Sequence, residues 1–231
     1  MIQKHIATSI IQYQQLGVDI LQQIFSESQN RPFHLALTGG SSVAPVYKQL
    51  PSLIHSWTQT HLWWSDERLV PLDSPDSNYY QAQKAFIEKI DIPETQVHPV
   101  HTSLPPAQAA SNYAHQISTL IPNSIFDLVL LGLGPDGHIA SLFPNHSGLF
   151  GSSDSYVIPI LDSPKPPPER ITFTLNLLSQ AQNILLFTKG AERVAMLETA
   201  LATSQHTPQL PFTLLLPQHT NIHLLMCPDS E

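Results

Sequence analysis

The chain has 231 residues and a formal net charge of −8, and 42% of its residues are hydrophobic whereas only 12% are charged. This balance excludes a largely disordered chain, because enough apolar side chains are present to form a sizeable core. The acidic charge argues against general binding to nucleic acid or to anionic membranes. No apolar run approaches the length of about 18 residues that a membrane span requires.

A single cysteine, Cys227, cannot form a disulfide within the chain, which favours a reducing compartment. The first twenty residues have the amphipathic pattern of a helix and lack the apolar segment and small-residue cleavage site of a secretion signal. We therefore expect a cytoplasmic protein. Patches that mix basic and aromatic residues, typical of nucleic-acid-binding domains, are absent from the sequence.

Apolar residues recur at helical spacing over the first thirty residues, and short apolar runs bounded by Gly, Pro, Asp or Ser follow them. In chain order the pattern predicts a helix over the first thirty residues, a strand at 33–38, a short helix at 43–50, a strand at 61–65, helices at 78–90 and 104–121, strands at 126–131, 155–161, 170–175 and 181–190, a helix at 191–201, and strands at 212–216 and 221–227.

The alternation of strand and helix patterns predicts an α/β domain with a mostly parallel sheet covered by helices on both faces. No linker interrupts the pattern, so we expect one domain over residues 1–231. Ligands of such sheets bind beyond the carboxyl ends of the strands. The segments that follow the strands at 33–38, 61–65 and 126–131 are GGSS, DER and GLGPDGH. We expect these three segments to face one crevice.

The segment GLGPDGHIASLFP, residues 132–144, has the glycine spacing of a dinucleotide-binding loop. Such a loop must open into a long helix, whereas fewer than two helical turns fit here before Pro144. A nicotinamide cofactor is therefore not expected. Gly134 and Gly137 allow a tight turn that presents His138, and a short helix beginning there would favour an anion. Alternatively, His138 caps the helix or completes the core.

Other polar groups stand at the ends of the predicted strands. The GGSS loop at 39–42 offers backbone amides and hydroxyls suited to a phosphate, or is an ordinary strand–helix turn. In an extended strand end, Asp66 and Arg68 point to one side and Glu67 to the other. Lys165 and Arg170 flank a proline-rich loop and either clamp a phosphate or lie in solvent. The histidines lack metal-ligand spacing, so we expect no metal site.

Taken in order, LALTGGSS, WWSDERLVP with DSNYYQA, FDLVLLGLGPDGHIASLFP and DSPKPPPERITFTL resemble the 6-phosphogluconolactonase family over residues 33–200. The resemblance implies a Rossmann-like three-layer α/β/α fold. It also implies hydrolysis of 6-phospho-D-glucono-1,5-lactone in the oxidative pentose phosphate pathway. The implied partner is this sugar-phosphate lactone, without metal or cofactor, and we expect a monomer or a weak homodimer.

The resemblance assigns roles to individual residues. It makes His138 the general base that activates water and Asp66 the residue that orients the imidazole or the sugar hydroxyls, while the amides of the loop hold the oxyanion. Arg193 stands where the family has a lysine, so the charge is kept, but the family's C-terminal Trp and Asp-Ala ending is missing. The residues implied to bind substrate are Gly39, Gly40, Ser41, Arg68, Gly137, Lys165, Arg170 and Arg193.

Two other functions compete with this interpretation. Glucosamine-6-phosphate deaminases share the sequence up to DGHIA but continue with Asn-Glu-Pro, whose acid serves the ring-opening histidine. Here Ser141 to Pro144 follow, and Phe143 takes the position of the acid. An apolar neighbour would keep His138 neutral, as a water-activating base requires. A sugar-phosphate-binding sensor would carry a DNA-binding module, which this sequence does not supply.

Overall fold

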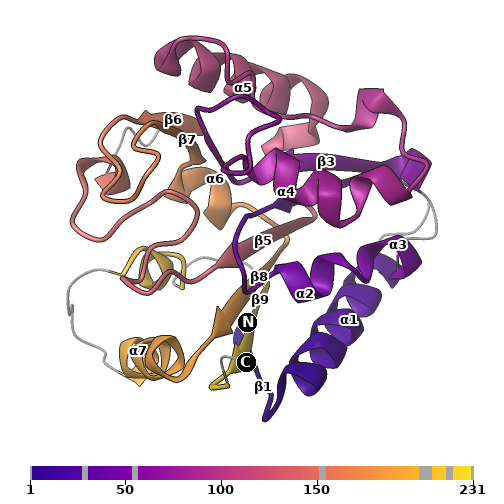
Figure 1. Ribbon diagram of the computed structural model, residues 1–231, viewed down its shortest axis with the longest axis vertical. Helices are drawn as coiled ribbons and strands as arrows, with labels where there is room; N and C mark the ends of the chain where they lie inside the picture. Colours follow the sequence, from indigo (N-terminus) through magenta and orange to yellow (C-terminus); the bar gives the residue numbers. More distant parts are fainter. Residues whose placement is uncertain are drawn as a thin grey trace.

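The computed structural model describes residues 2–27, 31–53, 57–150, 155–202, 210–216 and 221–229. Its centre is a six-stranded sheet in which every neighbouring pair of strands is parallel (Figure 1). In order across the sheet, the strands are β1 (Ile2–Ile6), β9 (Asn221–Cys227), β8 (Asn183–Lys189), β5 (Leu128–Gly132), β2 (Phe33–Leu37) and β3 (Thr60–Trp64). The predicted parallel sheet is confirmed.

Helices cover both faces of this sheet and produce three layers (Figure 1). The α-helices are α1 (Ile10–Ser26), α2 (Ala44–Tyr47), α3 (Leu50–Leu53), α4 (Asn78–Ala85), α5 (Pro106–Leu120), α6 (Leu175–Ser179) and α7 (Ala191–Ala202). Short 3-10 helices are η1 (Trp57–Gln59), η2 (Ile87–Lys89), η3 (Glu94–Gln96), η4 (Pro122–Ser124), η5 (Ser147–Phe150) and η6 (Pro211–Leu214). Within the described residues, no helix has both the length and the apolar character needed to cross a membrane.

Two hydrophobic cores lie on the two faces of the sheet. One joins the sheet to α1, α2, α3 and α4, and the other joins it to α5, α6 and α7. Along β2, Leu35 and Leu37 contribute to the first core whereas Ala36 contributes to the second. Successive residues of a strand point to opposite faces, so a strand covered on both faces must be apolar throughout. This explains the continuous apolar run of β5 and the mostly apolar β2, in which His34 is the one buried polar residue.

A second sheet of three antiparallel strands lies beside the first, in the order β4 (Asp66–Arg68), β7 (Arg170–Phe173) and β6 (Val157–Ile160). Its pairing brings Arg68 opposite Arg170. The DER segment, expected as the end of a parallel strand, is therefore a separate short strand. The alternation predicted for it is confirmed, because Glu67 is fully buried while Asp66 and Arg68 line a cavity.

The helix predicted over the first thirty residues is confirmed as α1 but begins later than expected, and the strand predicted at 212–216 is wrong. Residues 2–6 form the edge strand β1, in which Ile2 and Ile6 are exposed, and the helix begins only at Ile10 after the N-cap Ser9. Ile6 fits the helical spacing by coincidence, since it belongs to a strand paired with β9. In place of the strand expected at 212–216, residues 211–214 form η6. Pro211 at its first position has a fixed φ and no N–H to donate to a sheet.

A buried carboxylate joins β4 to α4. The Glu67 carboxylate accepts hydrogen bonds from the backbone amides of Arg68 (2.8 Å), Asn78 (2.7 Å) and Tyr79 (2.8 Å) and from the hydroxyl of Ser77 (3.0 Å). The amides of Asn78 and Tyr79 open α4 and have no acceptor within the helix. Glu67 therefore caps this helix and holds the strand that carries Asp66 and Arg68.

Replacing Glu67 should destabilise the fold. Glu67→Ala is expected to lower the free energy of unfolding by about 3 kcal/mol, because buried donors that lose their acceptor cost ~1–3 kcal/mol each. Urea denaturation monitored by circular dichroism measures this change. The matched control is Glu88→Ala, because Glu88 pairs with Lys84 on the surface and its loss should leave the midpoint nearly unchanged. Equal midpoints for the two variants would contradict the capping role.

Candidate functional site

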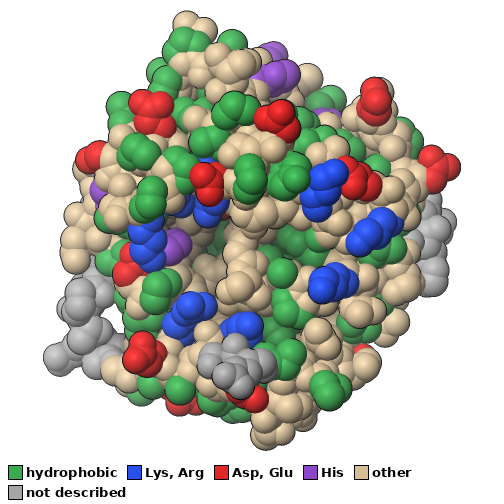
Figure 2. All heavy atoms as spheres, in the orientation of Figure 1, with side chains coloured by type: hydrophobic (Ala, Val, Ile, Leu, Met, Phe, Trp, Pro, Cys, Tyr) green, Lys and Arg blue, Asp and Glu red, His purple; other side chains and the backbone are tan. Residues whose placement is uncertain are grey.

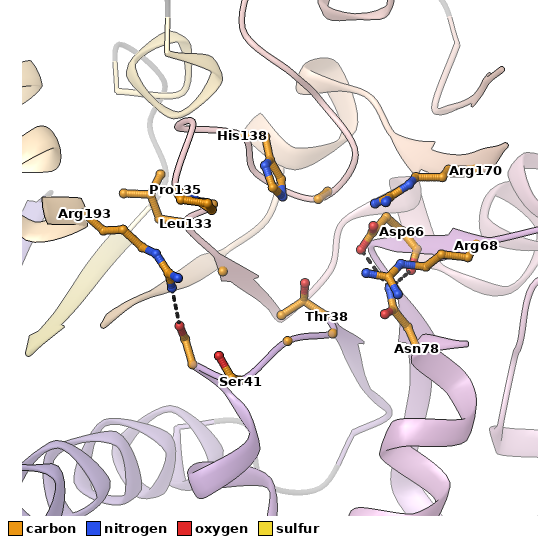
Figure 3. Close-up of a pocket in the computed structure, with 16 residues that line it drawn as sticks. Thr38, Ser41, Asp66, Arg68, Asn78, Leu133, Pro135, His138, Arg170 and Arg193 are labelled. Atoms are coloured by element: carbon orange, nitrogen blue, oxygen red, sulfur yellow. Dashed lines mark hydrogen bonds between the residues drawn. The ribbon is translucent and has the colours of Figure 1, made fainter. Parts of the chain in front are cut away.

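A cavity opens beyond the carboxyl ends of β2 and β5, between the two sheets (Figure 3). The three segments that the sequence analysis singled out meet there, so the predicted crevice is confirmed. Lys and Arg side chains gather around the hollow on this face of an otherwise acidic chain (Figure 2). The residues lining the cavity are Thr38, Gly39, Gly40, Ser41, Ser42, Asp66, Arg68, Asn78, Gly132, Leu133, Gly134, Pro135, His138, Ala140, Arg170 and Arg193.

A closed turn presents His138 to this cavity. The Gly137 amide donates to the Gly134 carbonyl (3.0 Å), and the Gly134 amide donates to the His138 carbonyl (2.9 Å). A Cβ on Gly134 would lie 2.2 Å from the imidazole, so only glycine lets the ring pack on the turn. Both of these amides therefore serve the turn and are not available to hold an oxyanion.

The chain does not enter a helix after His138. Ile139 and Leu142 exchange backbone hydrogen bonds across a tight turn, in which Ala140 has a positive φ of 48°. The Ser141 amide donates to the hydroxyl of Thr172 (3.1 Å), which fixes the turn to β7. The predicted short helix, with its partial positive charge, is therefore wrong. His138 does not cap a helix, and its ring points into the cavity (Figure 3).

Asp136 holds the imidazole of His138. Its Oδ1 lies 2.5 Å from His138 Nδ1. Burial alone would raise the pKa of Asp136, but hydrogen bonds from Lys165 and His138 hold it at about 2. The carboxylate is therefore ionised and can only accept, so Nδ1 carries the proton. This leaves the Nε2 lone pair free, and no described residue is hydrogen-bonded to it.

The environment of His138 favours its neutral form. Burial lowers the pKa of His138 below its ordinary value, although the hydrogen bond to Asp136 acts in the opposite direction. The Phe143 ring packs against the imidazole with a centroid distance of 4.8 Å. The apolar neighbour expected at position 143 is thus confirmed.

Asp66 lies in the cavity but is not hydrogen-bonded to the imidazole. Its carboxylate accepts from the hydroxyl of Ser141 (2.7 Å) and from Asn78 Nδ2 (3.1 Å). The imidazole-orienting role considered for Asp66 is filled in the structure by Asp136. Asp136 was not predicted from the sequence, because an aspartate between Pro135 and Gly137 is typical of an ordinary turn. Its position two residues before the candidate histidine was the available signal.

The three arginines of the cavity differ in their surroundings. Arg193 Nη1 lies 3.4 Å from the Ser42 hydroxyl, and its guanidinium faces Ser41 across the cavity from Arg68 (Figure 3). Arg68 Nη1 donates to the Asp76 carbonyl (2.7 Å). Arg170 is only 3% exposed, and its Nε and Nη2 donate to the carbonyls of residues 165–167 at 3.0–3.2 Å. Arg170 therefore also holds the proline-rich loop in place.

Two residues assigned from the sequence lie outside the lining of the cavity. Gly137 is buried with a φ of +87°, and a Cβ there would lie 2.2 Å from Leu210. Lys165 forms an ion pair with Asp136, with 3.0 Å between Nζ and Oδ1. Within the described residues, no group of three or more His, Cys, Asp or Glu side chains could hold a metal ion.

Comparison with known proteins gives a consistent result. The chain is 38% identical over 192 residues to the probable chloroplastic 6-phosphogluconolactonase 4 of Oryza sativa subsp. indica, covering 77% of this chain and 59% of the rice protein, so it spans less than two thirds of that relative. It is 38% identical over 196 residues to the 6-phosphogluconolactonase of Homo sapiens, covering 81% of this chain and 75% of the human protein.

A solved structure shares the whole fold. The crystal structure of 6-phosphogluconolactonase from Thermotoga maritima superposes with a TM-score of 0.87 at 28% identity, covering 98% of this chain and 100% of the other. The family model described as glucosamine-6-phosphate isomerases/6-phosphogluconolactonase matches residues 11–224. The chain therefore belongs to the family of glucosamine-6-phosphate isomerases and 6-phosphogluconolactonases.

Proposed function

We propose that this protein hydrolyses 6-phospho-D-glucono-1,5-lactone to 6-phospho-D-gluconate, a step of the oxidative pentose phosphate pathway. The observation that carries this proposal is the state of His138, a neutral imidazole with a free Nε2 inside a cavity lined by three arginines. A base in such a cavity suits a neutral ester group carried by an anionic substrate. The similarity to proteins named 6-phosphogluconolactonase supports the same conclusion.

In this mechanism His138 acts on water. Nε2 removes a proton from the water molecule as its oxygen attacks C1 of the lactone. The resulting imidazolium is stabilised by the Asp136 carboxylate on its other nitrogen. The bond between C1 and the ring oxygen then breaks, and the imidazolium returns the proton to that oxygen. A positioned general base contributes ~10²–10⁴-fold to such a reaction.

Side chains stabilise the negative charge that develops on the C1 oxygen in the transition state. The amides of Gly134 and Gly137 are engaged within their turn, so the negative charge that develops on the C1 oxygen needs another donor. The guanidinium groups of Arg68 and Arg170 line the cavity, and Nη1 of Arg170, which does not bind the loop carbonyls, is placed to supply such a donor beside Arg68. Asp66, with its carboxylate held by Ser141 and Asn78, is placed to accept from sugar hydroxyls.

We assign the phosphate group to the end of the cavity that holds Arg193, away from Asp66, Arg68 and Arg170. There the guanidinium of Arg193 faces Ser41 (Figure 3), and Gly40 of the same loop also lines the cavity. At the other end, the carboxylate of Asp66 would repel a phosphate, although Arg68 and Arg170 lie beside it. The combination of a guanidinium, hydroxyls and a glycine-rich loop suits a phosphate because each group donates hydrogen bonds.

The related deamination reaction is less compatible with this site. It requires opening a sugar ring and moving a proton between C2 and C1, for which an acid at position 143 would tune the histidine. In this chain Phe143 packs on the ring, so His138 has one carboxylate neighbour and one apolar neighbour. An apolar contact disfavours the imidazolium. Lactone hydrolysis needs only the neutral base.

Loss of the base should abolish most of the activity. His138→Ala is expected to lower kcat for 6-phosphogluconolactone hydrolysis by ~10²-fold or more. The assay couples the freshly generated lactone to 6-phosphogluconate dehydrogenase and follows NADPH. The control is His115→Ala, since His115 is exposed on α5 and should be dispensable. A folded His138→Ala protein with wild-type turnover would exclude His138 as the base.

Loss of the phosphate ligand should depend on the substrate. Removing a charge-assisted hydrogen bond costs ~1.5–3 kcal/mol. For Arg193→Ala this corresponds to about a 10- to 150-fold drop in kcat/KM with the phosphorylated lactone. Unphosphorylated glucono-1,5-lactone should be hydrolysed almost as before. Lys89→Ala removes an equal charge from the surface as a control. An equal loss on both lactones would place Arg193 elsewhere in the reaction.

The two activities of the family can be separated directly. We expect no ammonia from glucosamine-6-phosphate, because Phe143 can neither accept a proton nor stabilise an imidazolium. Purified protein is incubated with glucosamine-6-phosphate, and ammonia is measured with glutamate dehydrogenase, alongside lactone hydrolysis by the same preparation. Ammonia released at a rate comparable to lactone hydrolysis would refute the proposed function.

A further inference from the structure

Lys165 contacts both residues of the Asp136–His138 pair. Its Nζ lies 3.0 Å from Asp136 Oδ1 and 3.4 Å from His138 Nδ1. The proline-rich segment between β6 and β7 supplies this lysine, and its ammonium lies on the Asp136 side of the imidazole. Lys165 is not among the residues that line the cavity. Its contacts are therefore to the catalytic dyad and not to the space where substrate would bind.

The backbone of Lys165 is fixed on both sides. Its amide donates to the hydroxyl of Ser163 (3.2 Å), and that hydroxyl donates back to the Lys165 carbonyl (2.9 Å). The same carbonyl accepts from Arg170 Nη2 (3.1 Å). Ser163 and Arg170 are both buried, at 8% and 3% exposure. These contacts fix the backbone from which the Lys165 side chain reaches Asp136.

The contact between Lys165 and His138 is electrostatic. Because the single proton of Nδ1 is donated to ionised Asp136, Nδ1 has no lone pair to accept from the ammonium. The two groups are therefore neighbours without a hydrogen bond, and a proton added at Nε2 would place two positive charges side by side. At the same time Lys165 shares the Asp136 carboxylate, which otherwise favours the imidazolium.

Other charged groups face His138 from the surrounding elements. Asp66 on β4 favours the imidazolium. The guanidinium groups of Arg170 on β7 and Arg193 on α7 line the same cavity. Compared with these groups, Asp136 and Lys165 are in direct contact with the ring. The protonation of His138 should therefore respond most strongly to substitutions of Asp136 or Lys165.

We propose that Lys165 is a positioning residue that keeps the imidazole of His138 neutral by sharing the Asp136 carboxylate, in place of the phosphate contact expected from the sequence. This inference rests on the proposed function only in making His138 the base. The effect that it predicts, a change in the protonation of His138, is measurable without any substrate.

The first test is the titration of His138 in the intact, substrate-free protein. Its Cε1–H resonance is identified by its absence in the His138→Ala spectrum and followed with pH by NMR. In Lys165→Met the carboxylate is no longer shared, so the pKa of His138 should rise by ~1 unit. Lys165→Arg keeps the charge and should restore the wild-type titration. An unchanged pKa in Lys165→Met would overturn the proposal, even if the protein proved to have another activity.

The second test uses the pH dependence of lactone hydrolysis. The rate falls as His138 is protonated, so a higher pKa moves the acid limb of kcat to higher pH. In Lys165→Met this limb should move upward by ~1 pH unit, while KM for the phosphorylated lactone stays within about twofold. Arg193→Ala provides the contrast, because it should change KM and leave the limb in place. If Lys165→Met behaves like Arg193→Ala, Lys165 is a phosphate ligand and the proposal fails.

Discussion

The site depends on the divergence of the chain after two neighbouring parallel strands, β2 and β5. Both strands are buried on two faces and end at the same edge of the sheet. Beyond β2 the chain packs Val43 and Val46 into the core on the α1 face, whereas beyond β5 it packs Leu133 and Ile139 into the opposite core. The two loops must therefore separate, and the space between them is the cavity.

The small antiparallel sheet closes this space from the side. Its strand β4 is too short to be stable alone. Its position follows from its pairing with β7 and from the hydrogen bonds that the Glu67 carboxylate accepts from the first amides of α4. The two adjacent acids have opposite duties because successive side chains of a strand alternate. The Glu67 side chain points into the protein and accepts hydrogen bonds from buried amides, whereas the Asp66 side chain faces the cavity. One side of β4 therefore carries the acid that stabilises the fold, and the other side carries the acid that faces the cavity.

Much of this arrangement can be predicted from sequence because it follows from short-range pattern. Apolar runs identify the central strands, and the rule for parallel sheets brings their loops together. Patterns fail where the decisive contact is made in three dimensions. The edge strand β1 takes its conformation from pairing with β9, which is more than 200 residues away in the chain. Asp136 looks like a turn former, and its contact with His138 exists only because the turn closes between Gly134 and Gly137.

The sequence also shows charge without showing what each charge opposes. Lys165 and Arg170 look alike in the proline-rich motif, yet Lys165 pairs with a carboxylate whereas Nε and Nη2 of Arg170 donate to loop carbonyls. A base must be neutral to begin the reaction and must hold a proton briefly during it. Burial and Phe143 favour the neutral state, while Asp136 favours the protonated one. A lysine that shares this carboxylate weakens the second influence without removing the hydrogen bond that orients the ring. Orientation and proton affinity are thereby set by different atoms, which a lone Asp–His pair cannot achieve.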